Sequence, residues 1–164
     1  MIENNIGCYM SALRRQPNAM ALIRGKGEYC DIKGTVRFYQ LRSGVLTALE
    51  ISGLPTLCDK CKSPVFGFHI HEGECCTGNA GDPYADTGAH FDMCENMHPY
   101  HSGDMPPIFS SCGCGFMIFL TDRFCVRDIV GRTVVVHAHP DDFHTQASGN
   151  SGEKIACGEI LASC

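Results

Sequence analysis

One segment of the chain is rich in side chains that bind metal ions. Five of the eight histidines lie between residues 67 and 104, and they are His69, His71, His90, His98 and His101. A neutral imidazole is the commonest metal ligand among protein side chains. Asp104 closes the segment, and His137 follows a run of three valines further along. Six histidines and one carboxylate are enough donors for two ions, so the sequence predicts a metal centre.

A short strand is expected to present the first two of these histidines. From residue 65 to residue 71 the side chains alternate, with apolar residues on one face and His69 and His71 on the other. Two imidazoles that point the same way from one strand can bind a single ion. The long polar stretch that follows, residues 72–107, has little strand pattern. A loop of that length is usually functional or disordered, and its four potential ligands favour function.

The rest of the chain consists of short strand-like runs separated by turn residues. Strands are expected at residues 19–24, 34–41, 45–51, 115–120, 132–137 and 154–161, with a second polar loop over 140–154. The chain is therefore expected to be all-β, an antiparallel sandwich or barrel with two long loops, over residues 19–164. Residues 1–18 form an N-terminal arm or a short helix in which Ile6, Met10 and Leu13 share one face.

Composition sets limits on partners and compartment. A length of 164 residues suits one domain, and the net charge of −5 without a basic patch argues against a nucleic-acid partner. No apolar stretch approaches the roughly 20 residues that cross a membrane. The first 17 residues lack the continuous apolar core of a signal peptide. We therefore expect a cytoplasmic protein; the alternative is an exported one whose export segment was removed.

The twelve cysteines show no repeating spacing. In a chain of this size we expect one structural disulfide, with most other cysteines reduced. Cys58-x-x-Cys61 resembles half of a zinc ribbon, but no second pair follows at the right spacing. Cys112-Gly-Cys114 could bind Cu(I) or cap a loop. For both motifs a structural role is the favoured interpretation.

Five motifs together resemble the copper/zinc superoxide dismutase family in its bacterial form. They are GFHIHE at 67–72, GAHFD at 88–92, HSGDMP at 101–106, VGRTVVVH at 130–137 and GNSGEKIACG at 149–158. The resemblance runs in order from about residue 19 to residue 160, and five colinear motifs are far more specific than any one of them. It implies a Greek-key β-sandwich or flattened barrel.

The resemblance also implies two metal sites that share one histidine. Copper would be held by His69, His71, His90 and His137, and zinc by His90, His98, His101 and Asp104. Imidazole suits both metals, and three histidines with a carboxylate suit a closed zinc site. Asp141 matches the carboxylate that links a copper histidine to a zinc histidine by hydrogen bonds.

A disulfide is implied as well, with Cys157 as one half. Its partner is one of the adjacent residues Cys75 and Cys76. Cys76 is favoured because bacterial members place a cysteine five residues after the second copper histidine.

The implied reaction is the dismutation of superoxide. One superoxide reduces Cu(II) and leaves as oxygen; a second reoxidises Cu(I) and leaves as hydrogen peroxide with two protons, one of them supplied by His90. Superoxide is then the only partner, and the protein is a monomer or a homodimer. The alternative is a non-catalytic copper- and zinc-binding protein on the same scaffold. Histidine at all four copper positions favours the enzyme.

The chain departs from the family pattern in three respects, and the surplus cysteines described above are the third. First, Lys154 stands where members usually carry the active-site arginine. A flexible point charge still attracts the anion but positions it more loosely, so we expect lower activity than with arginine. Second, only two residues separate His98 from His101, fewer than in better-known members. A copper-only protein is therefore a further alternative. His139 and His144 are expected to face solvent.

Overall fold

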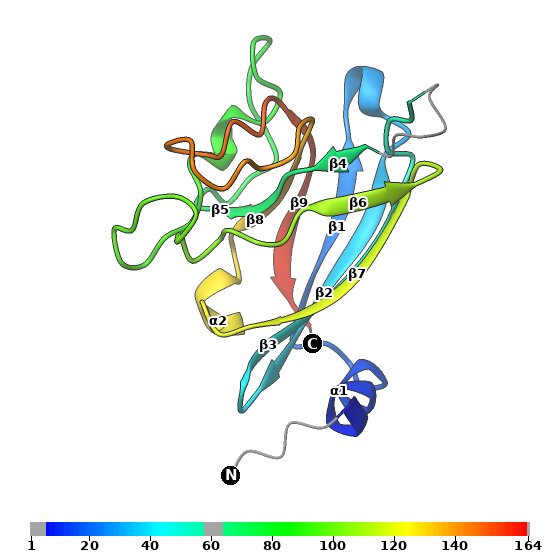
Figure 1. Cartoon of the computed structure of the whole chain (residues 1–164), viewed down its shortest axis with the longest axis vertical. Helices are drawn as coiled ribbons and strands as arrows, with labels where there is room; N and C mark the ends of the chain where they lie inside the picture. Colours follow the sequence, from blue (N-terminus) through cyan, green and yellow to red (C-terminus); the bar gives the residue numbers. More distant parts are fainter. Residues whose placement is uncertain (1–5, 58–63, 164) are drawn as a thin grey trace.

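The computed structural model describes residues 6–57 and 64–163. Its strands form a single antiparallel sheet in the order β4-β6-β7-β3-β2-β1-β9-β8-β5 (Figure 1). The strands are β1 (Ala19–Gly25), β2 (Lys33–Leu41), β3 (Gly44–Ser52), β4 (Val65–Phe66), β5 (Phe68–His71), β6 (Ile108–Ser111), β7 (Cys114–Thr121), β8 (Thr133–His137) and β9 (Lys154–Ala162). The helical segments are α1 (Ile6–Leu13), α2 (Val126–Ile129), and the 3-10 turns η1 (Gly27–Tyr29) and η2 (Ala85–Thr87).

The sheet curls until its two end strands meet. β4 and β5 lie at opposite ends of the strand order, yet only Gly67 separates them in the chain. A Cβ on Gly67 would lie 2.9 Å from Ser151 Oγ and 3.2 Å from His137 Cβ, so the close approach at this corner requires glycine. The pairs β1–β9, β3–β7 and β5–β8 join strands that are not consecutive. The prediction of an all-β Greek-key barrel is therefore confirmed.

Alternating side chains account for the barrel interior. In β1 every second residue is buried, and the inward-facing residues of β1 and β2 join one apolar cluster with residues of β5 and β8. Phe38, Leu49, Phe68 and Ile70 are fully buried there. The predicted strands form, except that the one expected over residues 65–71 is divided at Gly67 into β4 and β5. Neither β6 nor α2 was predicted. β6 directly follows two prolines, which hide its four-residue alternation, and α2 is only one turn long.

The N-terminal helix packs through a different face from the expected one. In α1, Ile6 and Met10 are 78% and 50% exposed, whereas Ala12 is buried. Tyr9, Ala12 and Leu13 pack against apolar side chains of β2 and β3 outside the main core. The expectation that Ile6 and Met10 line the packed face is wrong, because the helix meets the sheet with its last turn. The division of the chain at residues 18 and 19 stays a prediction.

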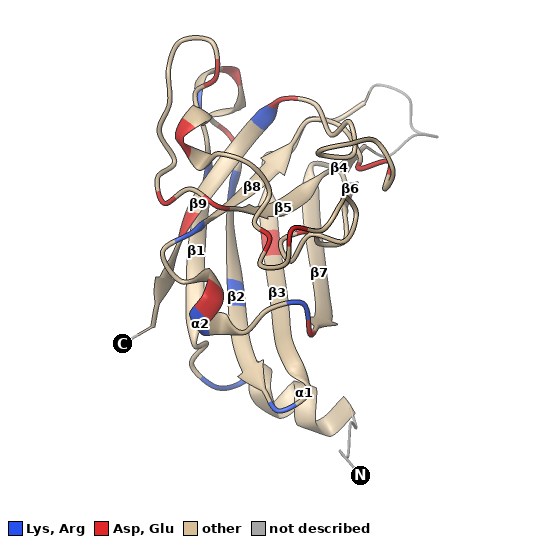
Figure 2. Cartoon of the chain, turned by 90° about the vertical axis from the view of Figure 1, so that its left-hand side faces the viewer, with Lys and Arg blue, Asp and Glu red and all other residues tan. Residues whose placement is uncertain are grey.

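Two long loops lie beside each other next to β5 and β8 (Figure 1, green and orange). They span residues 72–107 and 138–153. Gln146 joins them, because its Oε1 accepts from His98 N–H at 3.0 Å and its Nε2 donates to the His98 carbonyl at 2.7 Å. Figure 2 shows Asp and Glu residues spread along the loops that surround β5, β8 and β9. In the described part of the chain, no helix has the length and apolar character to cross a membrane.

Candidate metal centre

Two paired strands position three histidines. β5 pairs antiparallel with β8, with Ile70 opposite Val134. His69 and His71 point to the same side of β5, as the alternation predicts, and His137 ends β8 at the Gly67 corner. All three side chains are buried. The register of one strand pair therefore sets the position of these imidazoles.

The first long loop returns to β5 and brings further ligands with it. Phe91 N–H donates to the Ile70 carbonyl at 2.8 Å, and Ile70 N–H donates to the Gly103 carbonyl at 2.9 Å. These bonds set His90 beside His71 and Asp104 beside His69 as isolated antiparallel bridges. The loop thus pairs with β5 without forming a regular strand.

The donors gather in two adjoining clusters. The strand-built cluster consists of His69, His71, His90 and His137, and the loop-built cluster of His90, His98, His101 and Asp104. Within each cluster the four donor atoms lie within 4.8 Å of one another. His90 belongs to both, so one ring can offer a nitrogen to each side.

The hydrogen bonds of the strand-built cluster leave lone pairs pointing inward. His71 Nδ1 donates to the Gly88 carbonyl at 2.9 Å, and His137 Nδ1 donates to the Gly152 carbonyl at 3.2 Å. The Nε2 atoms of both neutral rings then carry lone pairs, and they face each other at 3.2 Å. Two lone pairs this close repel unless a cation lies between them. His69 Nδ1 and His90 Nε2 are buried without any hydrogen-bond partner. These four nitrogens fit a bound metal ion.

The loop-built cluster shows the same signature. The Nδ1 atoms of His98 and His101 are buried and lack a well-aligned hydrogen-bond partner. Both lie close to Asp104 Oδ2, at 3.1 and 3.2 Å, and His90 Nδ1 lies 2.7 Å from Asp104 Oδ1. Three imidazoles and a carboxylate form the donor set of a closed zinc site. The two-residue gap between His98 and His101 therefore does not prevent their rings from converging.

Asp141 connects the two clusters. Its Oδ2 accepts from His69 Nε2 and its Oδ1 from His98 Nε2, both at 2.8 Å. These bonds fix which nitrogen of each ring faces the metal position. Gly149 covers the carboxylate with φ of +65°, and a Cβ there would lie 2.1 Å from Asp141 Oδ1. Only glycine fits that position.

Burial keeps the imidazoles of His71, His90 and His137 in their neutral form at neutral pH. Desolvation, with the neighbouring His69 as the next cause, lowers the pKa of His137 to about 3. Desolvation lowers the pKa of His71 and His90 as well. For Asp104, burial alone would raise the pKa, but the hydrogen bond from His90 and the nearby imidazoles lower it below the ordinary value. The site therefore presents neutral imidazoles and an ionised carboxylate, which metal binding requires.

The structure joins Cys76 to Cys157 in a disulfide with Cα atoms 5.7 Å apart and leaves Cys75 as an exposed thiol. The bond ties the first long loop to β9. Cys112 and Cys114 are exposed thiols that flank the turn between β6 and β7. Cys58 and Cys61 lie outside the described residues, so the zinc-ribbon interpretation is not tested.

Lys154 has a partner that the sequence did not reveal. It begins β9 opposite His137, and its side chain is only 16% exposed. The Nζ atom donates to Asp82 Oδ2 at 2.9 Å and to the Tyr84 carbonyl at 3.1 Å. Asp82 was missed because it lies 72 residues away in a polar loop, with no motif to mark it. His139 and His144 are exposed and belong to neither cluster.

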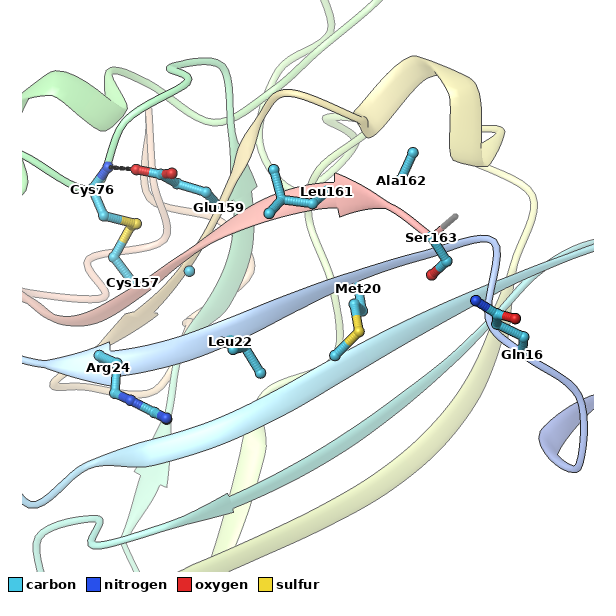
Figure 3. Close-up of a pocket in the computed structure, with 11 residues that line it drawn as sticks. Gln16, Met20, Leu22, Arg24, Cys76, Cys157, Glu159, Leu161, Ala162 and Ser163 are labelled. Atoms are coloured by element: carbon cyan, nitrogen blue, oxygen red, sulfur yellow. Dashed lines mark hydrogen bonds between the residues drawn. A yellow bond between two sulfur atoms is a disulfide. The ribbon is translucent and has the colours of Figure 1, made fainter.

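A separate hollow lies on the outside of the barrel (Figure 3). It has a volume of about 560 Å³ and lies along β1 and β9 beside the disulfide, lined by apolar side chains such as Met20, Leu22 and Leu161. No histidine lines it. The chemistry of the molecule therefore lies with the buried histidines and not with this open apolar surface.

A nearly closed antiparallel barrel with two histidine clusters that share one imidazole defines a two-metal β-barrel protein. Comparison with known proteins agrees with this class. The sequence model of copper/zinc superoxide dismutases matches residues 32–160. The chain belongs to the copper/zinc superoxide dismutase family.

Curated relatives support the same assignment. A Cu-Zn superoxide dismutase from Deinococcus radiodurans is 33% identical over 151 residues, which is 80% of this chain and 78% of the relative. Superoxide dismutase [Cu-Zn] 3 from Arabidopsis thaliana is 32% identical, over 92% of this chain and 94% of the relative. Superoxide dismutase [Cu-Zn] 1 from Aquifex aeolicus is 30% identical, over 85% and 84%. The protein is therefore an enzyme that uses copper and zinc to convert superoxide to oxygen and hydrogen peroxide.

Proposed function

We propose that the two clusters divide the metals between them. Copper binds the strand-built cluster of His69, His71, His90 and His137. Zinc binds the loop-built cluster of His90, His98, His101 and Asp104. The observation that supports this division is the set of buried ring nitrogens without partners on both sides of His90. An all-nitrogen set suits copper, and the set that contains a carboxylate suits zinc.

In this proposal copper supplies one-electron redox chemistry when bound, and zinc supplies fixed positive charge. His90 would be a ligand of both ions, with neither ring nitrogen protonated. Its Nε2 would take up a proton from solvent when it is not a ligand and give it to the departing peroxide, whose second proton would come from solvent. Asp141 keeps the rings of His69 and His98 in one tautomer throughout, since both Nε2–H groups donate to its carboxylate.

Lys154 is proposed to attract the anionic substrate. The net charge of −5 does not decide this attraction, because the local field does. Lys154 lies opposite His137 in the β8–β9 pair, and its Nζ is held in place by Asp82 and Tyr84. The residue therefore presents a positioned cation next to the strand-built cluster.

Metal analysis of two variants, combined with a dismutase assay, tests the division. His137→Ala is expected to lose copper and keep zinc, and Asp104→Ala to lose zinc and keep copper. Inhibition of cytochrome c reduction by superoxide measures the activity of each. If both variants lose the same metal, the division is wrong. If the wild-type protein binds both ions tightly and shows no activity, a non-catalytic metal carrier replaces the enzyme.

We also propose that the protein works without nucleic-acid or membrane partners, as a monomer or a homodimer in the cytoplasm. The acidic charge and the absence of a basic run in the sequence support the first point. Sedimentation velocity on the metal-loaded protein decides between the two oligomeric states.

A further inference from the structure

Arg123 is an exposed residue in the connection between β7 and α2, outside both metal clusters. Its guanidinium reaches across to the first long loop. The Nη1 group donates to three backbone carbonyls, those of Pro99 at 2.8 Å, His101 at 3.1 Å and Asp104 at 3.3 Å. Two of these carbonyls belong to residues of the loop-built cluster.

Residues 99–104, the segment that Arg123 contacts, are also tied to β5 by the backbone bond from Ile70 N–H to the Gly103 carbonyl, but few side chains support them. His98, which precedes this segment, is fixed from the second loop by Gln146 and Asp141. Toward the end of the segment, His101 N–H donates to Asp104 Oδ2. Both residues belong to the segment, so this bond does not fix the segment relative to the barrel. Asp92 accepts a hydrogen bond from Ser102 N–H, but Asp92 belongs to the same loop. Among the described residues, Arg123 is thus the side chain from outside the loop that hydrogen-bonds to residues 99–104, in addition to the backbone bond from Ile70 N–H to the Gly103 carbonyl.

Arg123 holds the three carbonyl groups in fixed positions relative to one another, although all three lie close to solvent. They lie beside a hollow of about 360 Å³ that Pro99, Asp104 and Arg123 help to line. Without the guanidinium, water would solvate each carbonyl separately and would not join them. A single planar cation that bonds three acceptors also fixes their relative positions. His101 and Asp104 would then lose part of their preorganisation for a metal ion.

We propose that Arg123 is a positioning residue for the loop-built cluster and sets its affinity for zinc. The inference rests on the proposed division of the metals. It also predicts selectivity, because His69, His71 and His137 are held by the β5–β8 pair and do not depend on Arg123. Loss of Arg123 should therefore weaken zinc binding and leave copper binding unchanged.

The test compares Arg123→Met, Arg123→Lys and the control Arg127→Met. Arg127 lies four residues further on, and its side chain is 85% exposed and pairs with the adjacent Asp128. Arg127→Met therefore removes the same positive charge as Arg123→Met. Zinc affinity is measured by chelator competition, and the site's geometry by the visible spectrum of bound Co²⁺. Copper affinity is measured separately. The apo-protein's Tm is recorded for each variant.

Arg123→Met is expected to weaken zinc binding by about 10- to 100-fold and to change the Co²⁺ spectrum. Arg123→Lys should recover part of the affinity, and Arg127→Met should match the wild type. Zinc affinity within threefold of the wild type for Arg123→Met would overturn the inference. An equal loss of copper affinity would overturn it too, since that indicates a general loss of structure. If wild-type protein binds no Co²⁺ or zinc in this cluster, the division of the metals fails instead.

Discussion

The two metal clusters share His90 but are built in different ways. Three ligands of the strand-built cluster belong to β5 and β8, whose backbone hydrogen bonds fix their spacing. All four ligands of the loop-built cluster lie in the loop between β5 and β6, where no regular strand holds them. One cluster is therefore positioned by sheet register. The other depends on a few backbone bonds to β5 and on side chains that reach in from elsewhere, above all Asp141, Gln146 and Arg123.

This difference predicts how each cluster tolerates change. A strand ligand keeps its position when a distant side chain is altered, because the sheet and the core below it hold the backbone. A loop ligand depends on contacts that single substitutions can remove. The strand-built cluster should therefore lose affinity mainly through changes to its own ligands, whereas the loop-built cluster should lose affinity equally through residues that touch no metal.

The largest effect is expected from a strand ligand. His137→Ala removes one of the four inward-facing nitrogens. Loss of a residue that only hydrogen-bonds to a metal ligand typically lowers metal affinity or activity by roughly 10- to 100-fold, so loss of the ligand itself should lower dismutase activity by more than that. Activity per mole of protein and bound copper are measured together. His139→Ala is the matched control, since that histidine is exposed two residues away. Retained copper with wild-type activity in His137→Ala would show that this ring is not a ligand.

Asp141→Ala should affect the two clusters unequally. The carboxylate orients His69 and His98 alike, but β5 holds the backbone of His69, whereas His98 lies in the loop. Zinc affinity is expected to fall by about 10- to 100-fold, with a smaller loss for copper. Chelator competition for each metal gives the two values. Equal losses would contradict the contrast between strand and loop support.

Much of the strand-built cluster could be predicted from the sequence. Alternation alone set His69 and His71 on one face, and the core residues between them confirm it. The supports of the loop-built cluster could not be predicted in this way. Gln146 and Arg123 act across 48 residues and across 24 or fewer residues of chain, and each looks like an ordinary polar surface residue. The same holds for Asp82, which pairs with Lys154 across 72 residues beside the strand-built cluster. Hydrophobic periodicity and local secondary-structure propensity carry no information about contacts between irregular segments that are distant in the chain.

The face of α1 illustrates a second limit. Helical spacing predicted that Ile6, Met10 and Leu13 line one packed face, and two of these are exposed. An isolated amphipathic pattern shows which face is most apolar, but not which turn of the helix reaches the sheet. The same limit applies to β6, because four residues are too few for a periodic signal.

Stability of the apo-protein should fall as the pH is lowered from 7 to 5. The pKa of His137 is about 3 in the folded chain, against an ordinary value near 6.5 when unfolded. Between these values the unfolded chain binds more protons, so the free energy of unfolding decreases as pH falls. His137 alone contributes a loss of about 2 kcal/mol over this interval.

Urea unfolding of metal-free protein at the two pH values measures this loss. His137→Gln should reduce the pH dependence, since its amide does not titrate, while His144→Gln, an exposed control with a side chain 79% accessible, should not. Stability that is constant or higher at pH 5 would contradict the prediction. Bound metal should protect the protein down to the pH at which the ligands release it.

The smallest effect concerns Lys154, which lies outside both clusters but beside the strand-built one. Lys154→Arg is expected to raise kcat/KM for superoxide by up to about fivefold. The planar guanidinium has enough N–H donors to keep the hydrogen bond to Asp82 and still direct another donor toward the anion. Pulse radiolysis at low and high salt measures the rate, and the gain should shrink as salt increases.

Lys26→Arg is the control. Lys26 holds the same loop through the carbonyls of Cys76 and Pro83, so a change that only stiffens the loop would appear there too. A Lys154→Arg enzyme with an unchanged or lower rate would mean that superoxide does not use the charge at this position.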